Sequence, residues 1–232
     1  MDFNFNTDSN IMRNEFEKYY LSRHPYGRSE LDSITSIQNQ FISPYILEER
    51  QLHVTQMDVF SRLMMDRIIF FGTEFTRETC NIINAQLLFL ESTDAGKDIN
   101  IYVNSPGGSV YDGLGVIDTM NFITSPVATI CTGMAASMGA MLLVSGEKGM
   151  RASLPHGRVM IHQPLGGASG QASDIEIEAK EILKIKDELY DILATRTGQP
   201  KEKIYADADR NYWMTAPEAA EYGMIDKVIE RK

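Results

Sequence analysis

The sequence has 232 residues, of which 43% are hydrophobic and 23% are charged. This composition is typical of a globular chain and excludes a disordered or fibrous one. The formal net charge of −10 at pH 7 disfavours nucleic acid as a general partner, because phosphates repel an acidic protein. Only two cysteines are present, which excludes a disulfide framework and favours a reducing compartment.

The sequence contains neither the pattern of a membrane helix nor that of an export signal. No apolar run reaches the roughly 18–20 residues of a membrane helix, and the N-terminus lacks the basic-then-apolar order of a signal peptide. We therefore expect a cytoplasmic protein. Residues 1–40 keep no periodicity and are predicted to be a flexible extension or processed leader, in preference to a small cap. Residues 41–56 are expected to form an ordered but irregular arm.

From residue 60 onward, short apolar runs alternate with helical patterns. Strands are expected at 67–71, 98–103, 127–131 and 158–161, and helices at 76–91, 111–122 and 135–144. Strands that alternate with helices predict βαβ units around a largely parallel, twisted sheet, which is an α/β fold.

A glycine-rich segment and a long helix are expected next. Residues 164–170 contain a proline and three glycines, which excludes a regular helix. Residues 174–197 repeat apolar side chains every three or four positions, which predicts an amphipathic helix roughly 36 Å long. The apolar stripe fits either a core face or contact with another subunit, and the pattern alone leaves both open.

Ser137 stands among small residues where a strand is expected to turn into a helix. The free amides of a helix N-terminus can stabilise negative charge that develops beside such a serine. The arrangement is similar to a hydrolase nucleophile elbow, although the usual Gly-x-Ser-x-Gly spacing is missing. The alternative is a serine that simply caps the helix.

His162 follows the strand expected at 158–161, and sites of α/β proteins form at strand tips. A serine hydroxyl needs a nearby base, and histidine suits this role because it titrates near neutral pH. The alternative is a histidine packed at a strand end. His156 lies in a predicted turn, and His24 and His53 lie in the N-terminal arm, so these three are weaker candidates.

Gly107 and Gly108 follow Pro106 at another expected strand tip. Glycines there let backbone amides approach a ligand, as an oxyanion hole requires, although a lone pair of glycines is more often a tight turn. Together with Ser137 and His162, they complete a nucleophile, a base and an oxyanion cradle. The combination predicts a serine hydrolase.

Several of these segments resemble the ClpP family of Clp protease proteolytic subunits. The resemblance is carried by residues 104–108, 133–140, 158–167, 170–177 and 219–226 and runs from about residue 41 to the C-terminus. It implies a ClpP/crotonase-like α/β fold of repeated β-β-α units with a protruding handle helix. The protease domain would span 41–232, with a handle at about 163–197 made of the long helix and a glycine-rich strand. This favours subunit contact for the apolar stripe.

The resemblance also implies an activity and partners. Ser137 would be the nucleophile and His162 the general base of a serine endopeptidase, with the backbone amides of Gly108 and Met138 as oxyanion hole. The enzyme would form two stacked heptameric rings and cleave unfolded proteins, preferring apolar residues beside the cut. An AAA+ ATPase of the ClpX or ClpA/ClpC type would deliver these substrates. No cofactor is expected in this subunit, because the partner unfoldase uses the ATP.

One position departs from the family pattern. Most relatives carry the acid of the triad where this sequence has Asn211. An amide oxygen can still accept the histidine Nδ1–H, but it brings no negative charge. Asp207 and Asp209 are the nearest possible substitutes. The resemblance instead places Asp209 with Arg210 at the contact between rings, whereas a solvated loop pair is the alternative.

Two other functions compete with this interpretation. Asn211 could make the chain a weakly active or regulatory ClpP-type subunit that needs a partner ring. The related crotonase fold suggests an acyl-CoA enzyme, but such enzymes need no Ser-His pair, so the residues found here argue against it.

Overall fold

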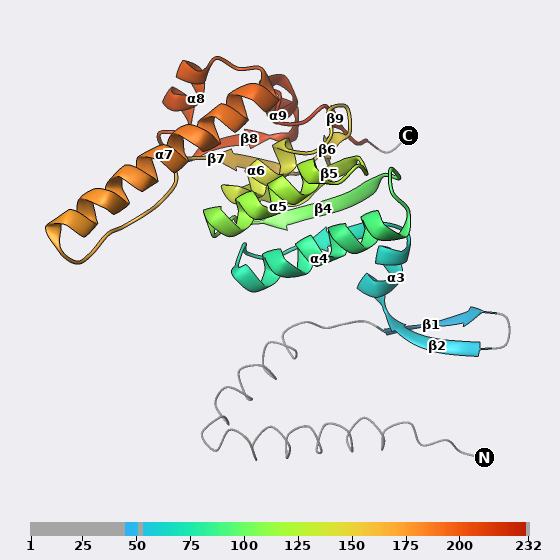
Figure 1. Ribbon diagram of the computed structural model, residues 1–232. Coiled ribbons are helices and arrows are strands. Elements are labelled where there is room, and N and C mark those ends of the chain that lie inside the picture. The colour runs from blue at the N-terminus through green and yellow to red at the C-terminus, as the bar shows by residue number, and fades with distance from the viewer. Residues whose placement is uncertain (1–44, 51–52, 231–232) are drawn as a thin grey trace, which may run out of the picture. The chain divides into compact units, whose positions relative to one another are not determined.

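The computed structural model describes residues 45–50 and 53–230, and the predicted extension at 1–40 lies outside them. The chain forms two compact units divided between Val59 and Phe60. In the first unit, β1 (Tyr45–Arg50) and β2 (His53–Asp58) pair antiparallel along their whole length (Figure 1). The prediction of an irregular arm at 41–56 is therefore wrong for residues 45–50 and 53–56, which form regular strands. Their regularity comes from backbone pairing, which the side-chain pattern does not reveal.

The strands and helices that follow have these bounds. The strands are β3 (Ile68–Phe71), β4 (Ile99–Ser105), β5 (Val127–Ala136), β6 (Arg151–Ser153), β7 (Arg158–Ile161), β8 (Tyr212–Thr215) and β9 (Lys227–Val228). The helices are α3 (Val59–Met65), α4 (Arg77–Thr93), α5 (Val110–Phe122), α6 (Met138–Val144), α7 (Ala172–Thr197), α8 (Lys201–Asp207) and α9 (Ala216–Tyr222).

The strands of the second unit form one sheet. Its main path is β3-β4-β5-β6-β9, in which every neighbouring pair is parallel. β7 pairs parallel with the end of β5 and antiparallel with β8. The predicted α/β class with a largely parallel sheet is confirmed, and the β7–β8 pair is the exception.

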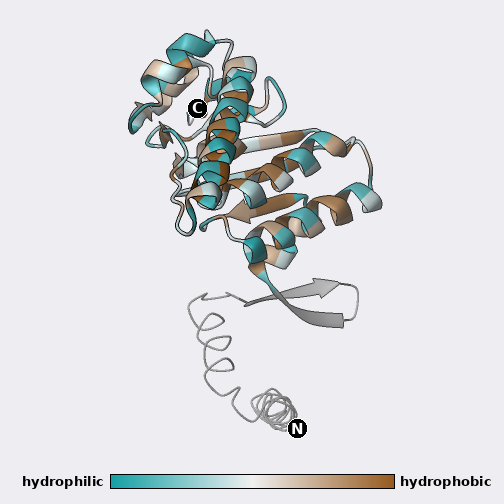
Figure 2. Ribbon diagram, turned by 60° about the vertical axis from the view of Figure 1, so that its left-hand side comes forward, coloured by the Kyte–Doolittle hydropathy of each residue, from teal (hydrophilic) through white to brown (hydrophobic). Residues whose placement is uncertain are grey.

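The core lies between the sheet and its helices. Alternate residues of β4 are buried, including Ile99, Ile101 and Val103. Helices α4, α5, α6 and α7 pack in this order, each on the next, and α6 is buried along its whole length. Figure 2 shows brown, hydrophobic strands beside helices of mixed colour, as expected for helices with one apolar face.

One predicted helix begins too early. Residues 135–144 were expected to be helical, but Ala135 and Ala136 end β5, and α6 begins at Met138. Alanine favours helices in isolation. Here the two alanines pair with β7, Ala135 with Val159 and Ala136 with Met160. Tertiary pairing therefore overrides the local preference.

The long helix predicted at 174–197 is confirmed as α7, which begins two residues earlier, at Ala172. Its C-terminal half is anchored by buried Leu189, Tyr190 and Leu193. Its N-terminal half extends beyond the sheet (Figure 1), and Ile177 there is 63% exposed. The glycine-rich strand implied for the handle is not formed in this single chain. Residues 163–169 adopt no strand and pair with none of the described strands.

Candidate active site

An irregular stretch of β5 places Ser137 at the strand tip. Residues 129–131 of β5 pair with β6, whereas residues 134–136 pair with β7. Between them the register with β4 shifts, because Val103 faces Cys131 while Ser105 faces Ala135. The Asn104 side-chain oxygen fills the gap by accepting a hydrogen bond from the Met134 N–H at 3.0 Å. This bulge bends β5 from one neighbour to the other.

Ser137 has an unusual backbone conformation, with φ 54° and ψ −122°. Positive φ is uncommon for a residue other than glycine and is often found at functional sites. The Ser137 N–H donates to the Met160 carbonyl at 2.9 Å, which ties the turn to β7. Ser137 precedes α6 in the N-cap position, but its hydroxyl makes no capping hydrogen bond. The hydroxyl is therefore free of the structural role that a capping serine would have.

The glycine turn lies directly against Ser137. Gly107 has φ +102°, and a β-carbon there would lie 2.6 Å from the Ser137 Cβ, so only glycine permits this approach. The Gly107 carbonyl accepts from the Phe75 N–H at 2.8 Å, which fixes the turn. Within the described part of the chain, neither the Gly108 N–H nor the Met138 N–H donates a hydrogen bond. Met138 is the first residue of α6, where an amide has no partner inside the helix.

The β7–β8 ladder brings His162 and Asn211 together. Ile161 faces Tyr212 in this antiparallel pair, so the next residue of one strand faces the preceding residue of the other. His162 Nδ1 lies 3.1 Å from Asn211 Oδ1. Because an amide oxygen can only accept, Nδ1 carries the proton and Nε2 is left with a free lone pair. This is the tautomer that a general base needs.

Ser137 and His162 line the same small cavity of about 20 Å³. Side chains from α5, α6 and α7 form most of its wall, including Val110, Met141 and Leu193. In the described residues, no hydrogen bond joins the Ser137 hydroxyl to the imidazole. A groove of about 570 Å³ between α5 and α7 is larger, but it contains neither residue.

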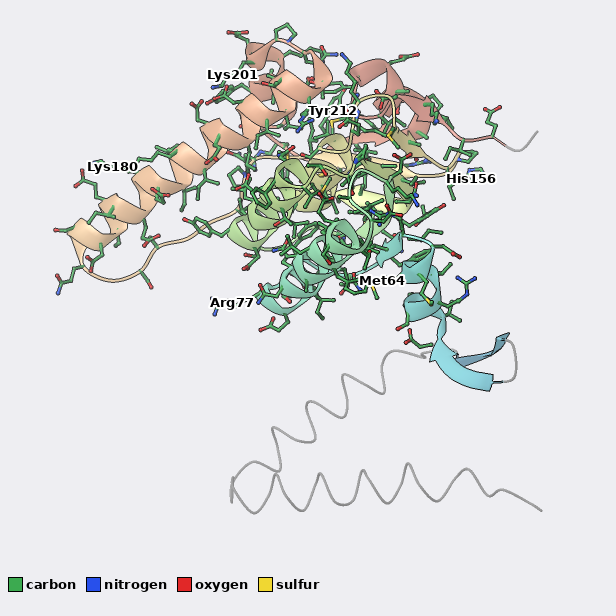
Figure 3. The ribbon with its side chains drawn as sticks, turned by 45° about the vertical axis from the view of Figure 1, so that its right-hand side comes forward. Met64, Arg77, His156, Lys180, Lys201 and Tyr212 are labelled. Carbon is green, nitrogen blue, oxygen red and sulfur yellow. The ribbon has the colours of Figure 1, made fainter. Side chains whose placement is uncertain are left out.

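The weaker candidates lie elsewhere. His156 does not line the cavity, and Figure 3 shows it on the side away from the projecting half of α7, where Lys180 is labelled. The Asp207 carboxylate binds Lys203 and the Tyr222 hydroxyl, so it does not replace the missing acid beside His162.

Asp209 and Arg210 are exposed, with 3.9 Å between their charged groups.

The described residues contain no group of three or more His, Cys, Asp or Glu placed to hold a metal ion. None of their helices has the length and apolar character needed to span a bilayer.

Sequence reasoning missed the part played by Asn104. Its partner is thirty residues away, so no local pattern points to it. The strand-tip position was its only signal, since Asn104 directly precedes the serine and glycines of the turn.

Comparison with known proteins bears out the resemblance found in the sequence. The family model described as Clp protease matches residues 50–232. An ATP-dependent Clp protease proteolytic subunit from Porphyromonas gingivalis is 63% identical over 218 residues, which cover 94% of this chain and 98% of the relative. A subunit of the same name from Bacteroides fragilis is 66% identical over 202 residues, covering 87% and 98%.

A more distant relative agrees with these. The ATP-dependent Clp protease proteolytic subunit 1 of a Synechococcus species is 56% identical over 189 residues, covering 82% of this chain and 96% of the relative. The family-model match at 50–232 includes the strand tips, the glycine turn and the His-Asn pair described above. The chain belongs to the Clp protease family.

Proposed function

We propose that this chain is the proteolytic subunit of an ATP-dependent Clp protease and acts as a serine endopeptidase through Ser137, His162 and Asn211. The observation that carries the proposal is the 3.1 Å contact between His162 Nδ1 and Asn211 Oδ1, in a histidine that shares a cavity with Ser137. That contact sets the tautomer in which Nε2 can accept a proton.

The reaction proceeds in two halves. The Ser137 Oγ attacks the peptide carbonyl while His162 Nε2 takes its proton, and the tetrahedral oxyanion accepts hydrogen bonds from the amides of Gly108 and Met138. The imidazolium then donates its proton to the leaving amine, and the C–N bond breaks to give an acyl-enzyme. Water then attacks the ester while His162 Nε2 takes its proton. That proton passes to the Ser137 Oγ as the acyl C–O bond breaks, which releases the acid and regenerates Ser137 and neutral His162.

Asn211 acts on this reaction through His162. Its oxygen orients the imidazole but supplies no charge to the imidazolium that forms in each half. Hydrogen bonds between catalytic groups are often long without substrate and shorten when it binds. We therefore expect the Ser137–His162 bond, which the single chain lacks, to form in the substrate complex. The names of the relatives, all proteolytic subunits, give no support to a regulatory role.

The proposal extends to assembly and partners. Two heptameric rings would stack through the handle, which fits the exposed Ile175, Ile177 and Leu183 on the projecting half of α7. Asp209 and Arg210 would lie at the contact between rings. An AAA+ ATPase of the ClpX or ClpA/ClpC type would supply unfolded chains in the cytoplasm and use the ATP, and this subunit would need no cofactor. The relatives' own names include the term ATP-dependent.

Labelling with a fluorophosphonate probe tests the nucleophile. The wild-type chain is expected to become labelled, and Ser137→Ala to lose both labelling and peptidase activity. Ser145→Ala is the matched control, because Ser145 lies at the other end of α6 and its buried hydroxyl has no hydrogen-bond partner among the residues that the structure describes. Labelling that persists in Ser137→Ala would exclude Ser137 as the nucleophile.

A further inference from the structure

Gln163, the residue after His162, binds the turn that precedes Asn211. Its backbone N–H donates to the Ala208 carbonyl at 2.6 Å, and its side-chain Nε2 donates to the Asp209 carbonyl at 2.8 Å. One residue next to the imidazole therefore holds two successive carbonyls of the segment between α8 and β8. Asn211 follows two positions after the second carbonyl.

Helix α7 fixes the other end of the same side chain. Lys186 Nζ donates to Gln163 Oε1 at 3.1 Å and lies 5.4 Å from the ring centroids of both Tyr190 and Tyr205. A cation beside two aromatic rings is attracted by both, so its position is well defined. Because Lys186 can only donate, it keeps the amide oxygen of Gln163 towards α7 and the amide nitrogen towards the turn.

A third hydrogen-bond donor to the turn comes from α7. The Tyr190 hydroxyl donates to the Ala208 carbonyl at 3.2 Å, so this carbonyl accepts from two residues. Burial, together with the nearby Asp209 charge, raises the pKa of Tyr190 to about 12, so the hydroxyl remains a donor in the neutral range. The turn before Asn211 is thus held by donors from α7 and from the loop that follows β7.

Asn211 itself has little else to hold it. It is exposed, and in the part of the chain that the structure describes its side chain has no hydrogen bond besides the one with His162. A neutral amide also lacks the charge that would draw a carboxylate towards the imidazole. The position of the turn therefore decides whether Asn211 Oδ1 stays within reach of Nδ1.

We propose that Gln163 is a positioning residue for the peptidase site: it binds the turn at Ala208 and Asp209, keeps Asn211 against His162, and is itself held by Lys186 of α7. This inference rests on the proposed roles of His162 and Asn211. A glutamate cannot replace Gln163, because a carboxylate cannot donate to the Asp209 carbonyl and would face the Asp209 charge.

Steady-state kinetics on a fluorogenic peptide test the proposal in the assembled enzyme. Gln163→Ala is expected to lower kcat about tenfold with KM changed less than twofold, since misplaced catalytic groups slow the chemical step. Gln163→Glu, which keeps the side-chain volume and the contact with Lys186, is expected to lower kcat by about the same factor. Lys186→Met is expected to lower kcat less, by about threefold. An unchanged kcat in Gln163→Ala or in Gln163→Glu would overturn the proposal.

Two matched controls separate positioning from general loss of contacts. The side-chain Nε2 of Gln199 donates to the Tyr222 carbonyl at 3.0 Å, a bond of the same kind, so Gln199→Ala is expected to keep wild-type kcat. Lys184→Met removes an exposed lysine from the same helix as Lys186 and is likewise expected to have no effect. A loss in the controls equal to that in Gln163→Ala would assign the effect to stability and contradict the proposal.

A double-mutant cycle shows whether Gln163 acts through Asn211. In an Asn211→Ala background, Gln163→Ala is expected to lower kcat less than twofold, because the group that it positions is already gone. Independent losses that multiply would overturn the proposal. If instead Ser137→Ala retained activity, the proposed catalytic roles would fail, and the two failures would be distinguishable.

Discussion

At the scale of single residues, the third member of the proposed catalytic set is a neutral amide. A carboxylate at this position would orient the imidazole and also stabilise its positive charge, whereas Asn211 can do only the first. The 3.1 Å contact with His162 Nδ1 shows that the orienting part is in place. Exchanging the amide for other side chains separates the two contributions.

Two substitutions at Asn211 are expected to act differently. Asn211→Ala leaves the imidazole without an acceptor and should lower kcat at least tenfold. Asn211→Asp keeps the acceptor and adds a charge, so kcat should change less than about tenfold. The acidic limb of the kcat/KM profile should move to higher pH, because a nearby carboxylate favours the protonated imidazole. Peptidase assays between pH 5 and 9 measure both effects, and a large gain in Asn211→Asp would indicate a weakly active wild type.

The close approach of Gly107 to Ser137 can also be tested by substitution. In Gly107→Ala, the added methyl would lie 2.6 Å from Ser137 Cβ and 2.8 Å from the Ala136 carbonyl oxygen, so kcat should fall at least a hundredfold as Ser137 shifts. Gly96→Ala is the control, because Gly96 also has positive φ, +81°, but open space around it. Both variants share the backbone strain of about 1 kcal/mol. Equal activity in the two would contradict the close approach to Ser137.

The placement of the candidate site residues could be predicted from the sequence where it depends on local context. Ser137 and His162 stand at strand tips, and glycines mark the third loop of the site. The contacts of Asn104 and Gln163 could not be predicted in this way. Each depends on a partner thirty or more residues away, Met134 for the first and Asp209 for the second.

At the scale of elements, β3, β4, β5 and β7 were predictable because their apolar runs are short and closed by turns. The short parallel strands β6 and β9 were not predicted, because neither contains an apolar run. The pairing of β7 with β8 was not predicted either, although it sets the distance between His162 and Asn211. Strand β8 has exposed Tyr212 and Trp213 and no alternation that marks a strand. The residues of β5 that bend towards β7 were mistaken for helix for the same reason, since pairing partners decide their conformation.

A buried ion pair joins several of these elements and can be tested by stability. Arg151 on β6 pairs with Asp226 at 2.6 Å and also donates to the carbonyls of Val144 and Arg196. Asp226→Asn should lower the free energy of unfolding by about 3 kcal/mol, because it leaves a buried guanidinium unpaired. Chemical denaturation measures the loss. Glu176→Gln, in an exposed pair with Lys180, is the control and should change it by less than about 1 kcal/mol.

The same pair predicts how stability depends on pH. Burial acts to raise the pKa of Asp226, but the hydrogen bonds and charge of Arg151 outweigh it, so the pKa lies below its usual value. A lowered folded-state pKa stabilises the fold above the unfolded value of about 4, and this stabilisation is lost as the pH falls through the folded value. The difference between wild type and Asp226→Asn should therefore shrink below about pH 4. A difference that stays constant there would contradict this role of the pair.

At the scale of the whole molecule, α7 extends half its length away from the core with apolar side chains exposed. We expect another ring to cover them. Ile177→Glu should therefore give particles of half the wild-type mass in analytical ultracentrifugation, because charge in an apolar contact opposes association. Lys180→Gln, three residues further along the same exposed half, should leave the mass unchanged. Full-mass particles in Ile177→Glu would place the contact between rings elsewhere.

A peptide chloromethyl ketone tests directly whether Ser137 and His162 act together. The Ser137 Oγ adds to the ketone, His162 Nε2 displaces chloride, and the alkyl group stays on the imidazole. Peptide mapping by mass spectrometry should find the adduct on His162 in the wild type and no adduct in Ser137→Ala. Alkylation of His156 instead, or of His162 at an unchanged rate without the serine hydroxyl, would show that Ser137 and His162 do not act together.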